Sequence, residues 1–120
     1  DYPDRFVNTG ASEVSAVTMA VGLALEGKIP FVYTISSFFM RAAEPISIYL
    51  KNAQVPVILL GGGRNDNYEI DGYTHLGYTT QDYIKMLGIK DYYPETTEEI
   101  PALVAEIIKN KKPCFVSLVK

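Results

Sequence analysis

The acidic residue Glu13 stands where a glycine-containing turn meets a long apolar segment. It ends the run Asn8-Thr9-Gly10-Ala11-Ser12-Glu13, and residues 14–26 are rich in alanine, valine, leucine and methionine. One interpretation is structural, because Ser12 is a good helix N-cap and an acid in the first turn is stabilised by the helix dipole. The other is catalytic, because a carboxyl group entering a dry core can be kept protonated and exchange a proton with a ligand nitrogen. Residue spacing alone leaves both interpretations open.

Two adjacent aromatic residues, Phe38 and Phe39, follow an expected strand at the turn into an expected helix. They lie in the run Thr34-Ile35-Ser36-Ser37-Phe38-Phe39-Met40-Arg41. Both rings could belong to the core, as large apolar residues usually do. However, one of them must point off the core-facing side of the helix, where a flat heterocycle could stack on it. Arg41 could bind an anion or form a surface ion pair.

The third group with possible chemistry is Asp71-Gly72-Tyr73-Thr74-His75, which contains the only histidine of the chain. It lies in the longest irregular stretch, residues 61–78, directly after an expected strand. Loops beyond the carboxyl ends of parallel strands bind ligands, and long loops in compact domains are usually functional. A lone histidine is most often simply solvated, but Asp71 nearby favours substrate contact.

Common metal and nucleotide sites are not supported by the sequence. No second histidine and no cysteine cluster accompany His75, so a zinc site made by this chain alone is not expected. The run Gly61-Gly62-Gly63 lacks the Lys-Ser/Thr of a P-loop and the glycine spacing of a dinucleotide fold. We therefore expect that run to make only a turn.

Short apolar runs alternate with longer segments of helical pattern along the chain. The runs are continuous rather than alternating in hydrophobicity, which is typical of strands buried on both faces of a parallel sheet. We expect strands at residues 30–35, 55–60 and 114–119, with a weaker one at 91–93, and helices at 12–26, 36–53, 79–87 and 96–110. This order predicts an α/β domain with an open, mostly parallel sheet and helices on both faces.

Local signals predict how these helices begin and end. Residues 12–26 are apolar on nearly every side, so we expect a buried helix that ends at Gly27. Pro45 should kink the second helix or delay its start, because it lacks a backbone N–H donor. Thr96 with Glu99 matches a capping box at the start of the fourth helix.

Length, charge and cysteine content restrict the class of protein. The 120 residues fit a single domain with one core, residues 1–120. A net charge of −3 without a basic stripe argues against a nucleic-acid partner, and no apolar run reaches the roughly 20 residues that cross a membrane. No signal peptide is recognisable. The single cysteine, Cys114, is interpreted as a buried core thiol, so we expect a reducing, cytoplasmic compartment.

Four stretches together resemble the pyrimidine-binding domain of transketolase and 1-deoxyxylulose-5-phosphate synthase, which are thiamine-diphosphate-dependent enzymes. The likeness runs in order and at familiar spacing from Asp1 to about Leu87 and is looser thereafter. The stretches are residues 4–13 (DRFVNTGASE), 22–31 (GLALEGKIPF), 38–42 (FFMRA) and 71–75 (DGYTH). Four stretches in the right order are not expected by chance.

The resemblance implies a role for the residues near the expected helix starts. In that family, a glutamate at the position of Glu13 hydrogen-bonds N1′ of the cofactor's aminopyrimidine and promotes the tautomer that activates the thiazolium carbon. An aromatic residue at the position of Phe38 stacks on the pyrimidine. Ile35 and Arg41, which lie close to it in sequence, are expected to line the cofactor as well.

The same resemblance implies substrate contacts and also a diphosphate-binding half of the cofactor site that this chain does not supply. Asp71 and His75 match a pair that contacts substrate and assists proton movement, so His75 is the second expected catalytic residue. Nothing in the chain resembles the Gly-Asp-Gly…Asn motif that holds Mg²⁺ and the diphosphate, and the family's first strand is expected before Asp1. We therefore expect a domain that is incomplete at its N-terminus. A diphosphate-binding chain or domain should complete the site within a homo- or hetero-oligomer.

The sequence leaves three functions open, and departures from the family pattern support the third of them. The family usually has His or Gln where Val14 stands, commonly an aromatic where Ile35 stands, and often Gln where Leu76 stands. The leading expectation is a transketolase-like transferase that moves ketol or acyl units between sugar phosphates or 2-oxo compounds. A component of a 2-oxo-acid decarboxylase or dehydrogenase is the second. A module that kept the fold for assembly but lost catalysis is the third.

Overall fold

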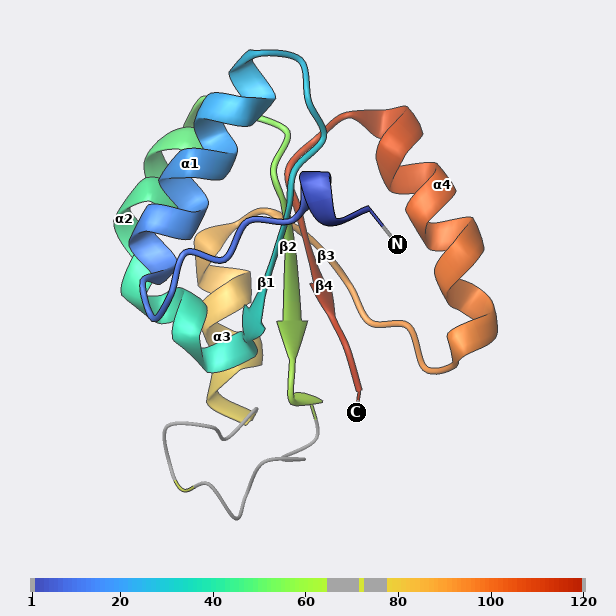
Figure 1. The fold of residues 1–120 in the computed structure, drawn as a ribbon. Helices are drawn as coiled ribbons and strands as arrows, with labels where there is room; N and C mark the ends of the chain where they lie inside the picture. The colour runs from blue at the N-terminus through green and yellow to red at the C-terminus, as the bar shows by residue number, and fades with distance from the viewer. Residues whose placement is uncertain (1, 65–71, 73–77, 120) are drawn as a thin grey trace.

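A computed structural model describes residues 2–64, 72 and 78–119 and contains a four-stranded parallel sheet between helices. The strands lie in the order β1-β2-β4-β3, and every neighbouring pair is parallel. Figure 1 shows α1, α2 and α3 on one side of this sheet and α4 on the other. The expected α/β architecture with helices on both faces is therefore confirmed. The strands are β1 Phe31–Ile35, β2 Ile58–Gly62, β3 Lys90–Tyr92 and β4 Cys114–Ser117.

The helical segments are less regular than expected. They are η1 Pro3–Arg5, α1 Glu13–Leu25, η2 Ser36–Ala42, α2 Ala43–Pro45, η3 Ile46–Asn52, α3 Tyr78–Leu87, η7 Thr97–Glu99 and α4 Ile100–Asn110. The expected single helix over residues 36–53 is a 3₁₀-helix (η2), a short α-turn (α2) and a π-helix (η3) in succession. Pro45 lacks a backbone N–H, so a regular α-helical ladder cannot continue through it, and the hydrogen-bond spacing changes there.

The carboxyl ends of the strands form the edge at which the candidate site lies. β2 extends two residues beyond its expected end at Leu60, because Gly61 and Gly62 continue the ladder opposite Thr34 and Ile35. The expectation that the glycine run makes only a turn is therefore wrong. Part of the run belongs to the sheet, where the absence of side chains allows neighbouring groups to approach closely.

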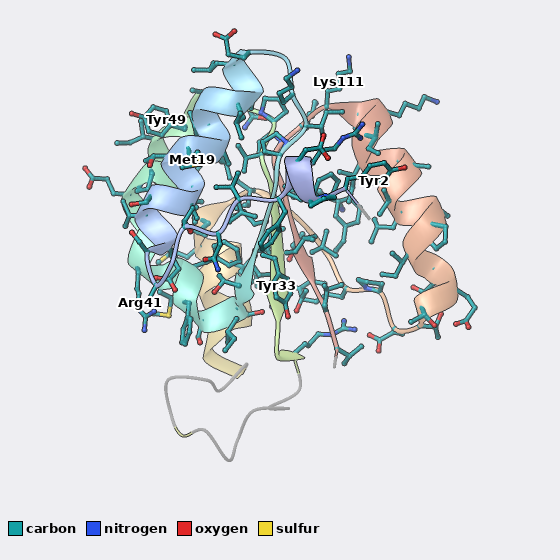
Figure 2. All side chains as sticks on the ribbon, in the orientation of Figure 1. Tyr2, Met19, Tyr33, Arg41, Tyr49 and Lys111 are labelled. Atoms are coloured by element: carbon teal, nitrogen blue, oxygen red, sulfur yellow. The ribbon has the colours of Figure 1, made fainter. Side chains whose placement is uncertain are left out.

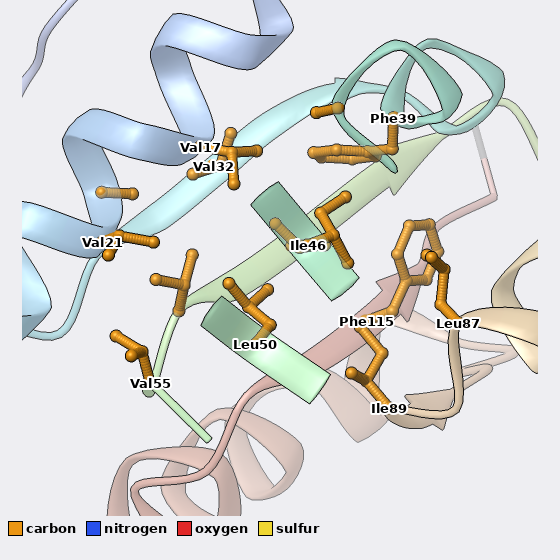
Figure 3. Packing of buried hydrophobic residues seen from close by; sticks show 14 of the residues in the cluster. Val17, Val21, Val32, Phe39, Ile46, Leu50, Val55, Leu87, Ile89 and Phe115 are labelled. Atoms are coloured by element: carbon orange, nitrogen blue, oxygen red, sulfur yellow. The ribbon is translucent and has the colours of Figure 1, made fainter. Parts of the chain in front are cut away.

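Two apolar clusters, one on each face of the sheet, hold the layers together. The larger is built from α1, η2, η3, α3 and the strands (Figure 3) and includes Val17, Phe39, Leu50 and Phe115. The smaller lies beneath α4 and contains Ile58, Ile107, Cys114 and Val116. The Cys114 thiol is buried, as expected, and desolvation raises its pKa to about 12.

Helix α1 buries only one of its sides. The buried residues are Val17, Ala20, Val21 and Ala24, whereas Val14, Met19, Leu23 and Leu25 are exposed. Figure 2 shows Met19 on the outer surface of this helix. The expectation of burial on nearly every side is wrong for this chain, because β1 and the η2–α2 segment pack on the buried side of the helix.

The ends of α1 follow the expectations in part. Gly27 has φ 80°, and the N–H of Lys28 donates to the carbonyl of Leu23 at 3.0 Å, so the helix ends at this glycine as expected. Ser12 does not cap the start of the helix, because its hydroxyl donates to the Ser15 hydroxyl at 2.7 Å instead.

The expected capping box before α4 does not form. The Thr96 hydroxyl donates to the Glu99 carboxylate at 3.1 Å, so the Thr96 side chain does not accept from a backbone N–H of the helix. The backbone N–H that donates to Glu99 belongs to Glu95, at 3.4 Å. The 3₁₀-helix η7 occupies the place of the first α-turn, so the spacing that a capping box requires is lost.

A substitution at Gly61 tests how tightly the edge of the sheet formed by the carboxyl ends of the strands is packed. A methyl group on Gly61 would collide with the Phe115 ring and with Ser36 Oγ. Gly61→Ala should therefore lower the free energy of unfolding by about 1–3 kcal/mol, the usual cost of overpacking a core. Gly22→Ala is the matched control, because a methyl group there meets no described atom within 4 Å. It should stabilise α1 by about 0.5–1 kcal/mol, and equal effects in denaturant unfolding would contradict this packing.

Candidate functional site

The Glu13 side chain lies in the first turn of α1 and is nearly enclosed, with 10% of its surface exposed. A tight turn precedes it. Gly10 has φ 67°, and its N–H donates to Oδ1 of Asn8 at 2.8 Å. Since this left-handed φ favours glycine, the turn explains the glycine that stands before the acid. Glu13 is thus an enclosed acid at the start of a helix, and its ligand-binding role stays a prediction.

Arg41 pairs with Glu13, which stands 28 residues earlier in the sequence. It thereby connects Glu13 to the turn after β1 that carries Phe38 and Phe39, here called the aromatic turn. Its Nη1 atom lies 3.0 Å from Glu13 Oε1, which makes an ion pair. Its guanidinium carbon lies 4.1 Å from the centroid of the Phe38 ring, which makes a cation–π contact. Figure 2 shows Arg41 near the amino-terminal end of α1. The structure therefore brings three of the expected site residues together.

Phe39 fixes the aromatic turn to the core, while Phe38 remains outside it. Phe39 is fully buried and packs edge to face on Phe115, with ring centroids 5.6 Å apart, whereas Phe38 is half-buried. The phenol of Tyr83 on α3 donates to the carbonyl oxygen of Phe39 at 3.2 Å. Burial raises the pKa of Tyr83 to about 12. The two adjacent rings thus point in different directions, one into the core and one toward Arg41.

The end of β1 brings apolar and polar groups to the same edge of the sheet. Ile35, its last residue, is half-buried and pairs with Gly62. The Ser36 hydroxyl that follows is buried and has no hydrogen-bond partner among the residues that the structure describes. Buried polar groups are normally satisfied, so this oxygen marks a place where a further contact belongs.

A buried arginine, Arg64, lies at the same edge, and the sequence reasoning does not single it out. It is only 4% exposed, and its guanidinium bonds the Glu95 carboxylate at 3.2 Å and the carbonyl oxygen of Pro94. Its backbone N–H donates to the carbonyl of Leu118 at 3.1 Å. Arg64 therefore ties together the segments that follow β2, β3 and β4. The signal that could have found it is a lone cation directly after a buried strand, at the ligand-binding edge of the sheet.

Asp71 and His75, the expected substrate-contacting pair, lie outside the described residues, so their roles stay predictions. Within residues 2–64, 72 and 78–119, no group of three or more His, Cys, Asp or Glu side chains is placed to hold a metal ion. In that same part of the chain, no helix is both long and apolar enough to traverse a bilayer.

The two arginines of the site should differ in their contribution to stability. Arg64→Ala should lower the free energy of unfolding by about 1–3 kcal/mol, because a buried carbonyl loses its donor. Arg41→Ala should lower it by less than about 1 kcal/mol, because a partly exposed ion pair contributes little. Denaturant unfolding of both variants measures the difference, and a larger loss for Arg41→Ala would contradict these burial assignments.

Tyr83 should make stability depend on alkaline pH. Its pKa is raised from 10.0 to about 12, so the folded chain holds the phenolic proton more tightly than the unfolded chain does. This contribution is complete below about pH 10 and is lost as the pH rises toward about 12. Tyr83→Phe should therefore flatten the alkaline decline of the unfolding free energy. Tyr33→Phe is the control, since Tyr33 is exposed, and an equal flattening in both variants would refute the role of burial.

Comparison with known proteins gives this arrangement a family. The family model described as the transketolase pyrimidine-binding domain matches residues 1–120. A 1-deoxy-D-xylulose-5-phosphate synthase of Clostridium botulinum is 30% identical over 115 residues, which cover 93% of this chain and 18% of the relative. A 6-deoxy-6-sulfo-D-fructose transketolase subunit of Clostridium sp. (strain MSTE9) is 24% identical over 120 residues, covering 98% of this chain and 37% of the relative.

A solved structure has the same fold. A split-gene transketolase, described as an inactive beta4 tetramer, matches with a TM-score of 0.84 and 24% sequence identity, covering 98% of this chain and 38% of that chain. This chain thus spans 18% and 37% of the length of the two curated relatives. Because the family model matches it from end to end, the chain belongs to the transketolase pyrimidine-binding domain family.

Proposed function

We propose that this chain supplies the aminopyrimidine-binding half of a thiamine-diphosphate-dependent, transketolase-like transferase. The observation that carries the proposal is the enclosed Glu13 carboxylate at the start of α1, which Arg41 connects to the half-buried Phe38 ring. Family membership supports thiamine diphosphate as the cofactor. The resemblance that gives Glu13 its contact with the aminopyrimidine is a resemblance to enzymes of this same family.

The residues of the site fit a flat heterocycle that carries nitrogen. The guanidinium of Arg41 is itself planar and nitrogen-bearing, and it fits against both the Glu13 carboxylate and the Phe38 ring. A carboxyl group can hold a proton at a ring nitrogen, and an aromatic face can stack on the ring. The half-buried Ile35 would add an apolar contact at the end of β1.

The chemistry of the reaction would belong to the cofactor, and the protein would orient it. Thiamine diphosphate supplies a nucleophilic carbon and an electron sink. Glu13 would hold the proton at N1′ of its aminopyrimidine, and Phe38 would fix the plane of that ring. Asp71 and His75 would contact substrate oxygens, with His75 moving a proton to or from the substrate.

A partner would complete the site. We propose a second chain or domain that binds the diphosphate and Mg²⁺, because the chain covers 18% of one relative and another is named a transketolase subunit. The exposed apolar residues of α1, which include Val14, Met19 and Leu23, support an interface on that side. We also propose an oligomeric enzyme in a reducing, cytoplasmic compartment, consistent with the free thiol of Cys114.

The proposed substrates are sugar phosphates or related 2-oxo compounds. Support comes from two relatives, a 1-deoxy-D-xylulose-5-phosphate synthase and a 6-deoxy-6-sulfo-D-fructose transketolase subunit. Turnover of the assembled enzyme with ketose phosphates and with simple 2-oxo acids would distinguish a transferase from a decarboxylating component.

Glu13→Ala tests the proposal in the complex of this chain with its diphosphate-binding companion. Turnover should fall by at least about 100-fold, the lower range for loss of a general acid–base group. Calorimetric titration of thiamine diphosphate with Mg²⁺ should show weakened binding in the same variant. Both losses have one cause, removal of the carboxyl group that faces the ring nitrogen.

Glu44→Ala is the matched control for that experiment, because Glu44 is an exposed glutamate on the adjacent segment α2. It should leave turnover and cofactor binding unchanged. Full activity of the Glu13→Ala complex would end the assignment of this residue.

A further inference from the structure

Arg41 fills the volume that a flat heterocycle would need in the proposed site. Its guanidinium lies 3.0 Å from Glu13 Oε1 and, through its central carbon, 4.1 Å from the centroid of the Phe38 ring. One planar group therefore contacts both the carboxylate and a face of the ring. A ring that stacked on this face and hydrogen-bonded Glu13 would need the same volume, because it would have to make the two contacts that the guanidinium makes now.

We propose that Arg41 is a displaceable occupant of this site and that the aminopyrimidine of thiamine diphosphate replaces it on binding. The inference rests on the function proposed above and adds a step to it. Guanidinium and aminopyrimidine are both planar and both carry N–H groups. The exchange therefore substitutes one stacked, hydrogen-bonded group for another, while Glu13 and Phe38 keep their positions. One proton, taken up from water and held between Glu13 and N1′, replaces the positive charge that leaves with Arg41.

The free chain has a physical reason to keep the arginine there. With 10% of its side chain exposed, the Glu13 carboxylate is largely withdrawn from water. A charge in such a place loses part of its hydration, and a partner of opposite charge offsets some of that loss. Arg41 supplies the opposite charge and also packs on the Phe38 ring.

The same arginine is able to leave. Its side chain is 53% exposed, so most of its surface is already hydrated and its contacts are easily replaced by water. Ion pairs of such exposure are weak. By contrast, the guanidinium of Arg64 is buried and bonded to Glu95 and Pro94, so it is held in place.

Occupation by Arg41 reduces the apparent affinity for the cofactor. When a binding-competent state is only partly populated, the apparent dissociation constant rises by the inverse of its fraction. Arg41→Ala should remove this competition and lower the apparent Kd for thiamine diphosphate by about threefold to tenfold. The measurement is calorimetric titration of thiamine diphosphate, with Mg²⁺ present, into the complex with the diphosphate-binding companion.

Arg41→Lys tests whether the positive charge or the planar shape of Arg41 is what competes with the cofactor. Lysine keeps the positive charge but not the planar group that stacks on Phe38. The proposal predicts an affinity between those of the original protein and Arg41→Ala. Arg5→Ala is the control, because Arg5 makes a comparable contact with the Tyr2 ring, 4.6 Å from its centroid, at a different place in the chain. It should leave the affinity unchanged.

A second readout does not depend on activity or on affinity. In arginine-labelled protein, the Nε–H signal of Arg41 should be shifted by the ring current of Phe38 before cofactor is added. Saturation with thiamine diphosphate should abolish that shift, as Phe38→Leu should in the free protein. The corresponding signal of Arg5 serves as an internal reference.

The outcomes separate this inference from the function on which it rests. If the original complex binds the cofactor while Arg41→Ala binds it equally or more weakly, the displacement is refuted and the function stands. A ring-current shift of the Arg41 signal that persists at cofactor saturation would likewise refute the displacement and leave the proposed function standing. If neither protein binds the cofactor at all, both proposals fail.

Discussion

A carboxylate held away from water beside a planar cation organises the candidate site. Glu13 begins α1, whereas Phe38 and Arg41 lie on the turn after β1, so the site forms only where these two segments meet. The arginine offsets part of the hydration that the enclosed carboxylate loses, although a half-exposed ion pair adds less than about 1 kcal/mol to stability. The core behind the turn fixes its position, because Phe39 packs on Phe115 and leaves the neighbouring ring outside. The chemistry therefore depends on packing that does not itself contact a ligand.

Much of the sheet could be predicted from the sequence, while the helices could be predicted only in outline. The apolar runs at residues 30–35 and 114–119 correspond to β1 and β4, because strands buried on both faces leave a continuous hydrophobic signal. The change of hydrogen-bond spacing around Pro45 depends on how the following turns pack, which residue types do not specify. The exposed outer side of α1 could not be foreseen either, since an apolar surface indicates suitability for contact and not which partner is present.

The candidate site, too, could be predicted from the sequence only in part. Glu13 and Phe38 could be predicted as candidates, because the turn before one and the paired aromatics around the other are local signals. Their connection through Arg41 depends on a contact across 28 residues of sequence, which spacing does not report. The burial of Arg64 depends on the meeting of three strand ends, so it too is a property of the fold. Ser36 likewise becomes a buried hydroxyl only because Gly61 and its neighbours close around it.

The central claim is that the Glu13 carboxyl group faces a nitrogen of the cofactor's aminopyrimidine. An experimental structure of the chain with its diphosphate-binding companion, thiamine diphosphate and Mg²⁺ tests it most directly. The account predicts a distance of about 2.6–3.2 Å between a Glu13 carboxyl oxygen and N1′ of the ring, with the ring stacked on Phe38. An occupied cofactor site in which Glu13 still pairs with Arg41, while the pyrimidine lies against other residues, would contradict it.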